Sequence, residues 1–280
     1  MGSEMCIRDS VVTVVMVGAV STLTQEQGDP TLTEVWEPEP PIVIPNASGG
    51  PPSDAVILFD GSDLSALQSR SGEAPPWEVS DGVLTVMPNS GDIVTKQGFG
   101  DVQLHVEWRT PSIVTGGGQD RGNSGVYLMS RYEVQVLDSY ENRTYSNGQA
   151  GSIYKQHIPL VNASRAPGAW QTYDNIFVAP RFHVDGTVAQ PAAMTVLHNG
   201  VLIQNHVLLQ GPSIFIGEPE YETHGPIEPL LLQEHDHPVS YRNIWVRGLR
   251  IWDSHLVLRR TIGGWPFMSR VKAHGLSQML

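Results

Sequence analysis

Cysteine and basic residues are both scarce in this chain of 280 residues. The single cysteine, Cys6, cannot form an internal disulfide or a metal site built from several thiolates. Charged residues make up only 16% of the sequence, and the acidic ones outnumber the basic ones to give a net charge of −12. A nucleic-acid partner is therefore not expected, because phosphate contacts need clustered lysine and arginine side chains.

Long apolar runs are also missing, and the most apolar stretch lies near the amino terminus. VVTVVMVGAVSTLT (residues 11–24) follows Arg8, is too short for a membrane-spanning helix and has the length of a signal-peptide core. We predict a signal peptide over residues 1–24, a periplasmic or secreted protein, and no membrane span after the peptide is removed. A buried valine-rich strand is the alternative interpretation, and the opening MGSEMCIRDS supports no inference.

The rest of the chain divides into a linker, one domain and a tail. Residues 25–54 are acidic and rich in proline, which is typical of an extended tether. Strand-like runs begin at Ala55 and continue to Trp252, so we place the folded domain at residues 55–252. Residues 253–280 show no clear period and stay unassigned.

Turn residues recur at short spacing through residues 55–252. The chain has 28 glycines and 21 prolines, and its Asp-Gly and Asn-Gly pairs separate short runs such as DVQLHVEWR (101–109) and YEVQVL (132–137). In MTVLHNGVLIQ, Asn199-Gly200 joins two apolar runs, which predicts a hairpin with a type I′ turn. Many short strands and few helical periods predict an all-β fold, a two-sheet antiparallel sandwich or jelly roll.

Six ordered segments share one resemblance. They are LFDGSDLSAL (58–67), WEVSDGVLTV (77–86), TKQGFGDVQLHVEWR (95–109), GQDRGNSGVYLMSRYEVQVLDSY (118–140), APGAWQTYDNIFVAPRF (166–182) and LQEHDHPVSYRNIWVRGL (232–249). Together they resemble the 3-keto-disaccharide hydrolase family, formerly a domain of unknown function. The resemblance implies a concanavalin-like jelly roll, exported by bacteria that degrade glycosides, and cleavage of sugars already oxidised at carbon 3.

The chemistry of a 3-keto sugar defines the side chains to look for. The carbonyl acidifies the hydrogen on carbon 2, so removing that proton allows the group on carbon 1 to be eliminated, and hydration then gives the free keto sugar. This route needs a base, an acid for the leaving oxygen and a donor at the developing enolate. An ordinary glycosidase instead needs two carboxylates at a set separation.

Glu133 and Gln135 share one face of the run YEVQVL, and Tyr132, Val134 and Val136 share the other. If the apolar face packs between two sheets, Glu133 and Gln135 project outward, where a jelly roll binds sugar. A solvated strand face is the alternative. We predict that Glu133 is catalytic and that Gln135 binds substrate.

LLLQEHDHP (230–238) is the second polar cluster. Read as a strand, it places Gln233, His235 and His237 on one face. Two histidines at this spacing serve as base and orienter, or ligate a divalent metal with a third ligand such as Glu133 or Asp174. We expect metal-free chemistry without a cofactor, with the metal site as the alternative. A turn capped by Asp236, with a solvated histidine on each side, is the alternative to a functional cluster.

Further candidates come from three other segments. AWQTYDNIFVAPRF is expected to form a strand with Trp170 and Asp174 on one face, where a ring can stack on sugar. Lys155 and Arg131 are candidate donors to the keto or enolate oxygen. The glycine-rich GQDRGNSG loop contributes two rim residues, Arg121 and Asn123.

These observations predict an exported glycoside-processing hydrolase that cleaves 3-keto-glycosides or disaccharides by proton abstraction at carbon 2, elimination and hydration. Its site contains catalytic Glu133, His235 and Asp174, with the other candidates binding substrate. The alternatives are a lectin-like module on the same fold, in which these residues only hydrogen-bond sugar hydroxyls, and a structural adhesion domain. Fold alone does not decide between them, because jelly rolls host lectins as readily as hydrolases.

Overall fold

The computed structural model describes residues 29, 31, 34–46 and 50–249. Residues 41–249 form one compact unit, and the described residues before Pro41 fall outside it. The segments assigned to the signal peptide and to the tail lie outside the described residues, so those two assignments stay predictions. No helix in the described part of the chain is long and apolar enough to cross a membrane.

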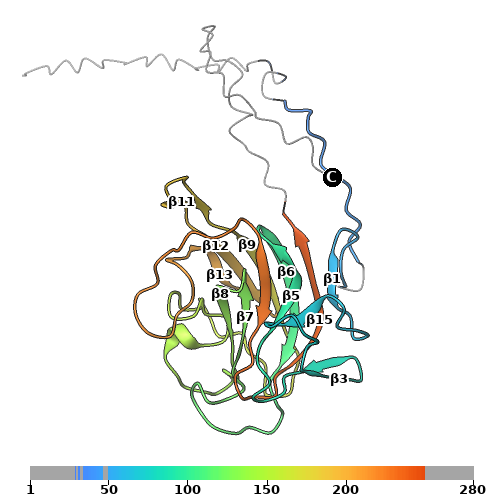
Figure 1. The fold of residues 1–280 in the computed structure, drawn as a ribbon, viewed down its shortest axis with the longest axis vertical. Helices are drawn as coiled ribbons and strands as arrows, with labels where there is room; N and C mark the ends of the chain where they lie inside the picture. Colours follow the sequence, from blue (N-terminus) through green and yellow to red (C-terminus); the bar gives the residue numbers. More distant parts are fainter. Residues whose placement is uncertain (1–28, 30, 32–33, 47–49, 250–280) are drawn as a thin grey trace, which may run out of the picture. The chain divides into compact units, whose positions relative to one another are not determined.

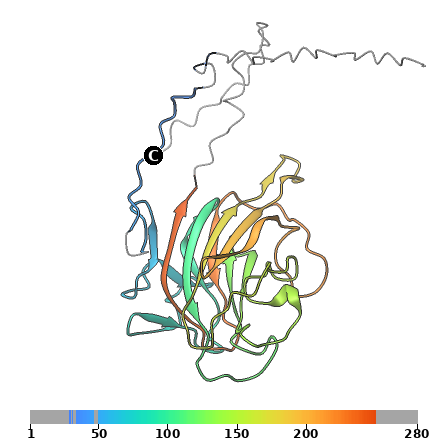
Figure 2. The same ribbon diagram turned by 180° about the vertical axis from the view of Figure 1, so that it is seen from behind.

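The domain consists of two antiparallel sheets and a small ribbon (Figures 1 and 2). The eight-stranded sheet has the order β13-β12-β9-β6-β15-β4-β3, with β1 also paired to β15, and the five-stranded sheet has the order β2-β5-β14-β7-β8. β10 and β11 form the ribbon. The strands are β1 (Val56–Phe59), β2 (Leu67–Ser69), β3 (Glu78–Ser80), β4 (Val83–Thr85), β5 (Ile93–Phe99), β6 (Val102–Arg109), β7 (Ser124–Leu128), β8 (Tyr132–Val136), β9 (Gln171–Val178), β10 (Arg181–Phe182), β11 (Val188–Gln190), β12 (Ala193–His198), β13 (Val201–Leu208), β14 (Glu228–Leu232) and β15 (Ser240–Gly248).

Between residues 50 and 249 the single helical element is the 3-10 helix η2 (Ser146–Gly148). The segment that follows η2 pairs with β8, since Ile153 forms an isolated bridge with Val134. The all-β, two-sheet antiparallel sandwich predicted from the turn spacing is therefore confirmed.

The core lies between the two sheets and follows the alternation of side chains along the strands. Tyr132, Val134 and Val136 of β8 are fully buried in it, as are Tyr173 and Phe177 of β9. The ring centroids of Tyr132 and Phe177 lie 5.4 Å apart across the sandwich. As predicted, the residues that alternate with Tyr132, Val134 and Val136 along β8 point away from the core. Glu133 and Gln135 therefore lie on the outer face of the five-stranded sheet.

Two turns with left-handed residues fix the strand registers. Asn199 and Gly200 have φ values of 53° and 79°, which is the geometry that a type I′ turn requires, and they join β12 to β13 as predicted. Met129 and Ser130 also have positive φ values, 55° and 54°, in the turn between β7 and β8. That turn sets Tyr127 opposite Glu133.

The prediction of a strand over residues 230–238 is correct only for residues 230–232 and wrong for the rest. β14 ends at Leu232, and residues 233–239 form a loop in which Asp236 has a φ of 58°. A left-handed residue interrupts the two-residue alternation of a strand, so side chains beyond Gln233 cannot be assigned to faces by counting. In the predicted linker, residues 34–46 contain no helix or strand.

Candidate active site

A pocket with about 150 Å³ of space opens on the outer face of the five-stranded sheet. We call it the Glu133 pocket. Its floor comes from β7 and β8, and its walls come from Asn123 just before β7 and from the loops that follow η2, β13 and β14. It is lined by Asn123, Tyr127, Glu133, Gln135, Tyr154, Ser213, Ile214, Phe215, Gln233 and His235. Five of the predicted site residues therefore meet in one place.

Glu133 is the carboxylate at the centre of this pocket. Its side chain belongs to the middle of β8 and only 3% of the residue is exposed. Burial raises the pKa of the Glu133 carboxyl to about 8, because a charged carboxylate is poorly solvated there, and a hydrogen bond with Tyr127 acts in the opposite direction. Burial and the neighbouring Glu133 together raise the pKa of Tyr127 well above its ordinary value. Glu133 is therefore protonated at neutral pH and Tyr127 keeps its proton.

Gln135 is held rigidly beside Glu133 by its amide group. Its Nε2 donates to Asn123 Oδ1 at 2.8 Å and to the carbonyl of Val136 at 2.9 Å. Asn123 in turn donates from Nδ2 to the carbonyl of Gln119 at 2.9 Å. The side-chain amide hydrogens of Gln135 are thus used within the protein, so its side-chain oxygen, Oε1, is the group suited to accept a hydrogen bond from a substrate hydroxyl.

Gly125 keeps the floor of the pocket open. It lies opposite Gln135 on β7, and a Cβ atom added there would come within 2.7 Å of Tyr127, 2.9 Å of Glu133 Oε1 and 3.1 Å of Gln233 Oε1. The first two distances are shorter than real Cβ contacts, so a larger residue would displace the side chains of Tyr127 and Glu133. Because Gly125 has no side chain, the space that a side chain would fill forms part of the pocket.

The loop after β14 adds Gln233 and His235 to the pocket but turns His237 away from it. Gln233 is anchored by a bond from its backbone nitrogen to the carbonyl of Gly125 at 2.9 Å, and its Nε2 donates to the Tyr127 hydroxyl at 3.3 Å. His237 instead lies with Nδ1 at 2.7 Å from the carbonyl of His235 and Nε2 at 3.3 Å from Asp120. His237 therefore supports the His235 loop and does not line the pocket.

Among the described residues, no three histidine, cysteine, aspartate or glutamate side chains come together as a metal site would require. In the metal alternative, His235 and His237 share one ion. The structure directs His237 toward Asp120, away from the lining of the Glu133 pocket. The absence of a cofactor stays a prediction.

The three predicted cationic residues lie at different places around the pocket. Arg121 donates from Nε to Asp138 Oδ2 at 2.8 Å and from a second nitrogen to the carbonyl of Tyr140, so it braces the rim loop. Arg131 occupies the β7–β8 turn, where its carbonyl accepts a bond from the Ser213 nitrogen at 2.8 Å. Lys155 lines a second, adjoining pocket. None of the three contributes to the lining of the Glu133 pocket.

Asp174 and Trp170 lie on the opposite side of the sandwich from the Glu133 pocket. Both side chains lie on the outer face of the eight-stranded sheet, with Asp174 on β9 and Trp170 just before it, whereas Glu133 lies outside the five-stranded sheet. The expectation of one site containing both Glu133 and Asp174 is therefore corrected. The alternation within β9 was predicted correctly, but alternation does not tell which sheet a strand joins.

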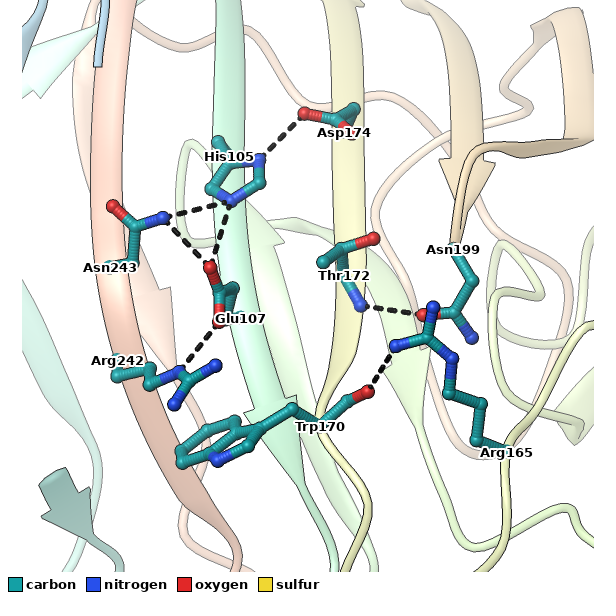
Figure 3. A network of polar contacts seen from close by, with 9 residues as sticks. All are labelled: His105, Glu107, Arg165, Trp170, Thr172, Asp174, Asn199, Arg242 and Asn243. Carbon is teal, nitrogen blue, oxygen red and sulfur yellow. Dashed lines mark hydrogen bonds and ion pairs between the residues drawn. The ribbon is translucent and has the colours of Figure 1, made fainter. Parts of the chain in front are cut away.

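Asp174 belongs to a separate polar network centred on His105. Its Oδ1 lies 2.7 Å from His105 Nδ1, and Asn243 donates to Glu107 Oε1 at 2.8 Å and lies 3.4 Å from the other ring nitrogen of His105 (Figure 3). Asn243 reaches this position from a bulge in β15, where its φ is 45°. Trp245 stacks on the His105 ring at 5.1 Å. Both ring nitrogens of His105 therefore face neighbouring polar groups, which suits a structural role.

The Glu133 pocket also contains residues that the sequence analysis missed, namely Tyr127, Tyr154, Ser213, Ile214 and Phe215. Tyr127 could have been found, because the short β7–β8 hairpin sets it opposite Glu133 on the same face. The others come from loops distant in sequence, and no periodic pattern marks them.

Comparison with known proteins gives a family for this arrangement. The family described as the 3-keto-alpha-glucoside-1,2-lyase-like domain matches residues 54–247. The chain belongs to this family. The match includes every predicted site residue from Arg121 to His237, and two of the six resembling segments, 118–140 and 232–249, contribute side chains to the Glu133 pocket.

Solved structures support the same assignment. A "putative glycosyl hydrolase" from Parabacteroides distasonis ATCC 8503 is 51% identical, with a TM-score of 0.75, and the match covers 79% of this chain and 97% of that one. A second "putative glycosyl hydrolase" from the same organism is 20% identical, with a TM-score of 0.52 and coverage of 70% and 94%, and shows the shared fold. Comparison with curated proteins returned no match.

Proposed function

We propose that this protein is a carbohydrate-processing enzyme that cleaves 3-keto-glycosides by elimination across carbons 1 and 2, followed by hydration. The proposal rests on the environment of Glu133. This buried carboxyl, with a pKa raised to about 8, lies on the floor of a polar pocket that His235 also lines. A group that transfers protons near neutral pH needs a pKa close to the working pH. The family description, which refers to a lyase acting on a 3-keto-α-glucoside, supports the same chemistry.

In this proposal His235 takes the proton from carbon 2 as the double bond between carbons 1 and 2 forms. The bond from carbon 1 to the glycosidic oxygen breaks, and that oxygen receives the proton of Glu133. Water then adds its oxygen to carbon 1 and gives a proton to Glu133, while His235 returns a proton to carbon 2. Both residues end in their starting forms, and the sum is hydrolysis of the glycoside.

The remaining pocket residues bind and orient the sugar. The side-chain oxygen of Gln135 accepts a hydrogen bond from a sugar hydroxyl, and Asn123 and Gln233 surround the ring with further polar groups. Tyr127 contacts Glu133 by a hydrogen bond, which fixes the carboxyl at the floor. The 3-keto group gives the hydrogen on carbon 2 its acidity, so the unoxidised glycoside lacks a removable proton at this position.

A lectin-like module would need only hydrogen bonds to hydroxyls, which an ionised, exposed carboxylate provides well. A carboxyl buried beneath a pocket and kept protonated is costly for simple binding and useful for proton transfer. Export to the periplasm or to the medium is part of the proposal, supported by the apolar run at residues 11–24, which has the length of a signal-peptide core.

Turnover of a methyl 3-keto-glucoside by the full chain, compared with the unoxidised methyl glucoside, tests this proposal. We expect cleavage of the keto sugar alone, and loss of most turnover in Glu133→Gln. Cleavage of the unoxidised parent would indicate ordinary carboxylate-pair chemistry. Binding of either sugar without turnover would favour the lectin-like module.

A further inference from the structure

A second pocket of about 380 Å³ adjoins the Glu133 pocket. We call it the Lys155 pocket. The two share Tyr154, Ile214 and Phe215 as common walls, so a ligand that fills one can extend into the other. Its other lining residues are Asn147, Lys155, Gln156, Gln210 and residues 216–219.

Apolar side chains at the Lys155 pocket remain exposed to solvent. Phe215 is 68% exposed and Ile216 is 83% exposed, although both lie on a loop that contacts the body of the domain. Tyr154 lies beside them, and its hydroxyl is 2.8 Å from that of Tyr145. Exposed aromatic and aliphatic groups gathered at the mouth of a pocket are typical of a binding surface.

Lys155 positions the phenyl ring of Phe215. Its ammonium lies 4.2 Å from the centroid of that ring and donates a hydrogen bond to the Phe215 carbonyl. The rings of Tyr154 and Tyr145 are 5.7 and 5.8 Å from the same ammonium. The backbone of Lys155 has a φ of 59°, a conformation that residues other than glycine rarely adopt. Lys155 therefore links the Phe215 loop to the tyrosine pair.

The loop that carries Phe215 is fixed at several points. The Ser213 nitrogen donates to the carbonyl of Arg131 at 2.8 Å, and the Ser213 hydroxyl accepts a bond from the Glu133 nitrogen at 3.0 Å. At the start of the loop, Gln156 donates to the carbonyl of Gly211 at 3.0 Å. The Lys155 pocket is thus preformed, and its aromatic wall is connected directly to the strand of Glu133.

We propose that the Lys155 pocket is the subsite for the leaving group and that it selects an aromatic aglycone. This inference rests on the proposed function, which puts the broken carbon–oxygen bond next to Glu133. The group beyond that oxygen must leave through a neighbouring space, and the Lys155 pocket adjoins with Phe215 and Tyr154 as shared walls. A planar ring stacks on Phe215 better than an aliphatic ring of similar size does.

The test compares benzyl and cyclohexylmethyl 3-keto-glucosides. Both leaving groups are primary alcohols of similar size and acidity, so a difference in kcat/KM reports recognition of the aromatic ring. We expect the benzyl substrate to be favoured by roughly 2- to 12-fold, the range for one aromatic pair. Phe215→Ala should bring the ratio to about 1, and Lys155→Met should lower it. Val184 is a fully exposed apolar residue that lines neither pocket, so Val184→Ala should leave the ratio unchanged.

Failure of this inference and failure of the proposed function give different results. If the methyl 3-keto-glucoside is cleaved but the benzyl ratio is near 1 in the wild type, the aromatic subsite is refuted and the function stands. If no keto sugar is cleaved, calorimetric binding of the unoxidised benzyl and cyclohexylmethyl glucosides still decides. A benzyl preference lost in Phe215→Ala supports the subsite, whereas equal affinities, or tighter binding of a disaccharide, overturn it.

Discussion

Replacing Glu133 by glutamine should change how the stability of the protein depends on pH. The carboxyl has an ordinary pKa of 4.5 in the unfolded chain and a pKa of about 8 in the folded protein. Because the folded state holds this proton more tightly, its stabilising contribution is complete below pH 4.5 and is lost as the pH rises through 8. At 1.36 kcal/mol per pKa unit, the total loss is about 5 kcal/mol. Glutamine keeps the shape of the protonated carboxyl and does not titrate.

Thermal unfolding of the wild type and of Glu133→Gln, followed by circular dichroism between pH 5 and 9, measures this effect. Groups that titrate in both proteins cancel in the difference between their Tm values. That difference should move in favour of Glu133→Gln by roughly 8 to 16 °C from pH 5 to 9, since about 4 kcal/mol of the loss falls within this pH range and 1 kcal/mol shifts Tm by about 2–4 °C in a domain of this size. Glu78→Gln, which removes an exposed carboxylate on β3, should show no such trend. A Tm difference that stays constant across the pH range would refute the raised pKa of Glu133.

Three further predictions follow from the same site and its surroundings. The rate kcat/KM should fall as the pH rises through about 8, because Glu133 then loses the proton that it gives to the leaving oxygen; a profile still rising at pH 9 would contradict the acid role. Gly125→Ala should lower turnover at least tenfold while circular dichroism shows a folded protein, and Gly117→Ala, where a Cβ atom meets nothing within 4 Å, should keep full activity. Asp174→Asn should lower the free energy of unfolding by about 1 kcal/mol through the His105 hydrogen bond and leave kcat intact; normal stability with lost turnover would return Asp174 to the active site.

Local patterns predicted those parts of the fold that depend on neighbours in sequence. Asn199-Gly200 identified its hairpin because few dipeptides adopt two left-handed conformations in succession. The alternation of Tyr132, Glu133 and Val134 placed the carboxyl on an outer face, since only an apolar face can pack between two sheets. Both inferences use constraints that act within a few residues.

Inferences that depended on the arrangement of distant strands were less successful. The sequence predicts Asp174 and Glu133 in one site, although β9 joins the other sheet, because no local pattern encodes which sheet a strand enters. His237 was aligned with His235 by counting along a strand that ends at Leu232. The position of Phe215 beside the Glu133 pocket could not be predicted for the same reason, since contacts between residues distant in sequence fix its loop against β8.

The fate of the hydrogen on carbon 2 tests the account of the Glu133 pocket most directly. Methyl 3-keto-glucoside is converted in deuterium oxide and the released keto sugar is examined at once by proton NMR, with free keto sugar as the control for exchange without enzyme. Elimination and hydration predict deuterium at carbon 2 of the product, because the proton taken by His235 exchanges with solvent before it is returned. A product that retains its original hydrogen on carbon 2 at full turnover would contradict the elimination mechanism.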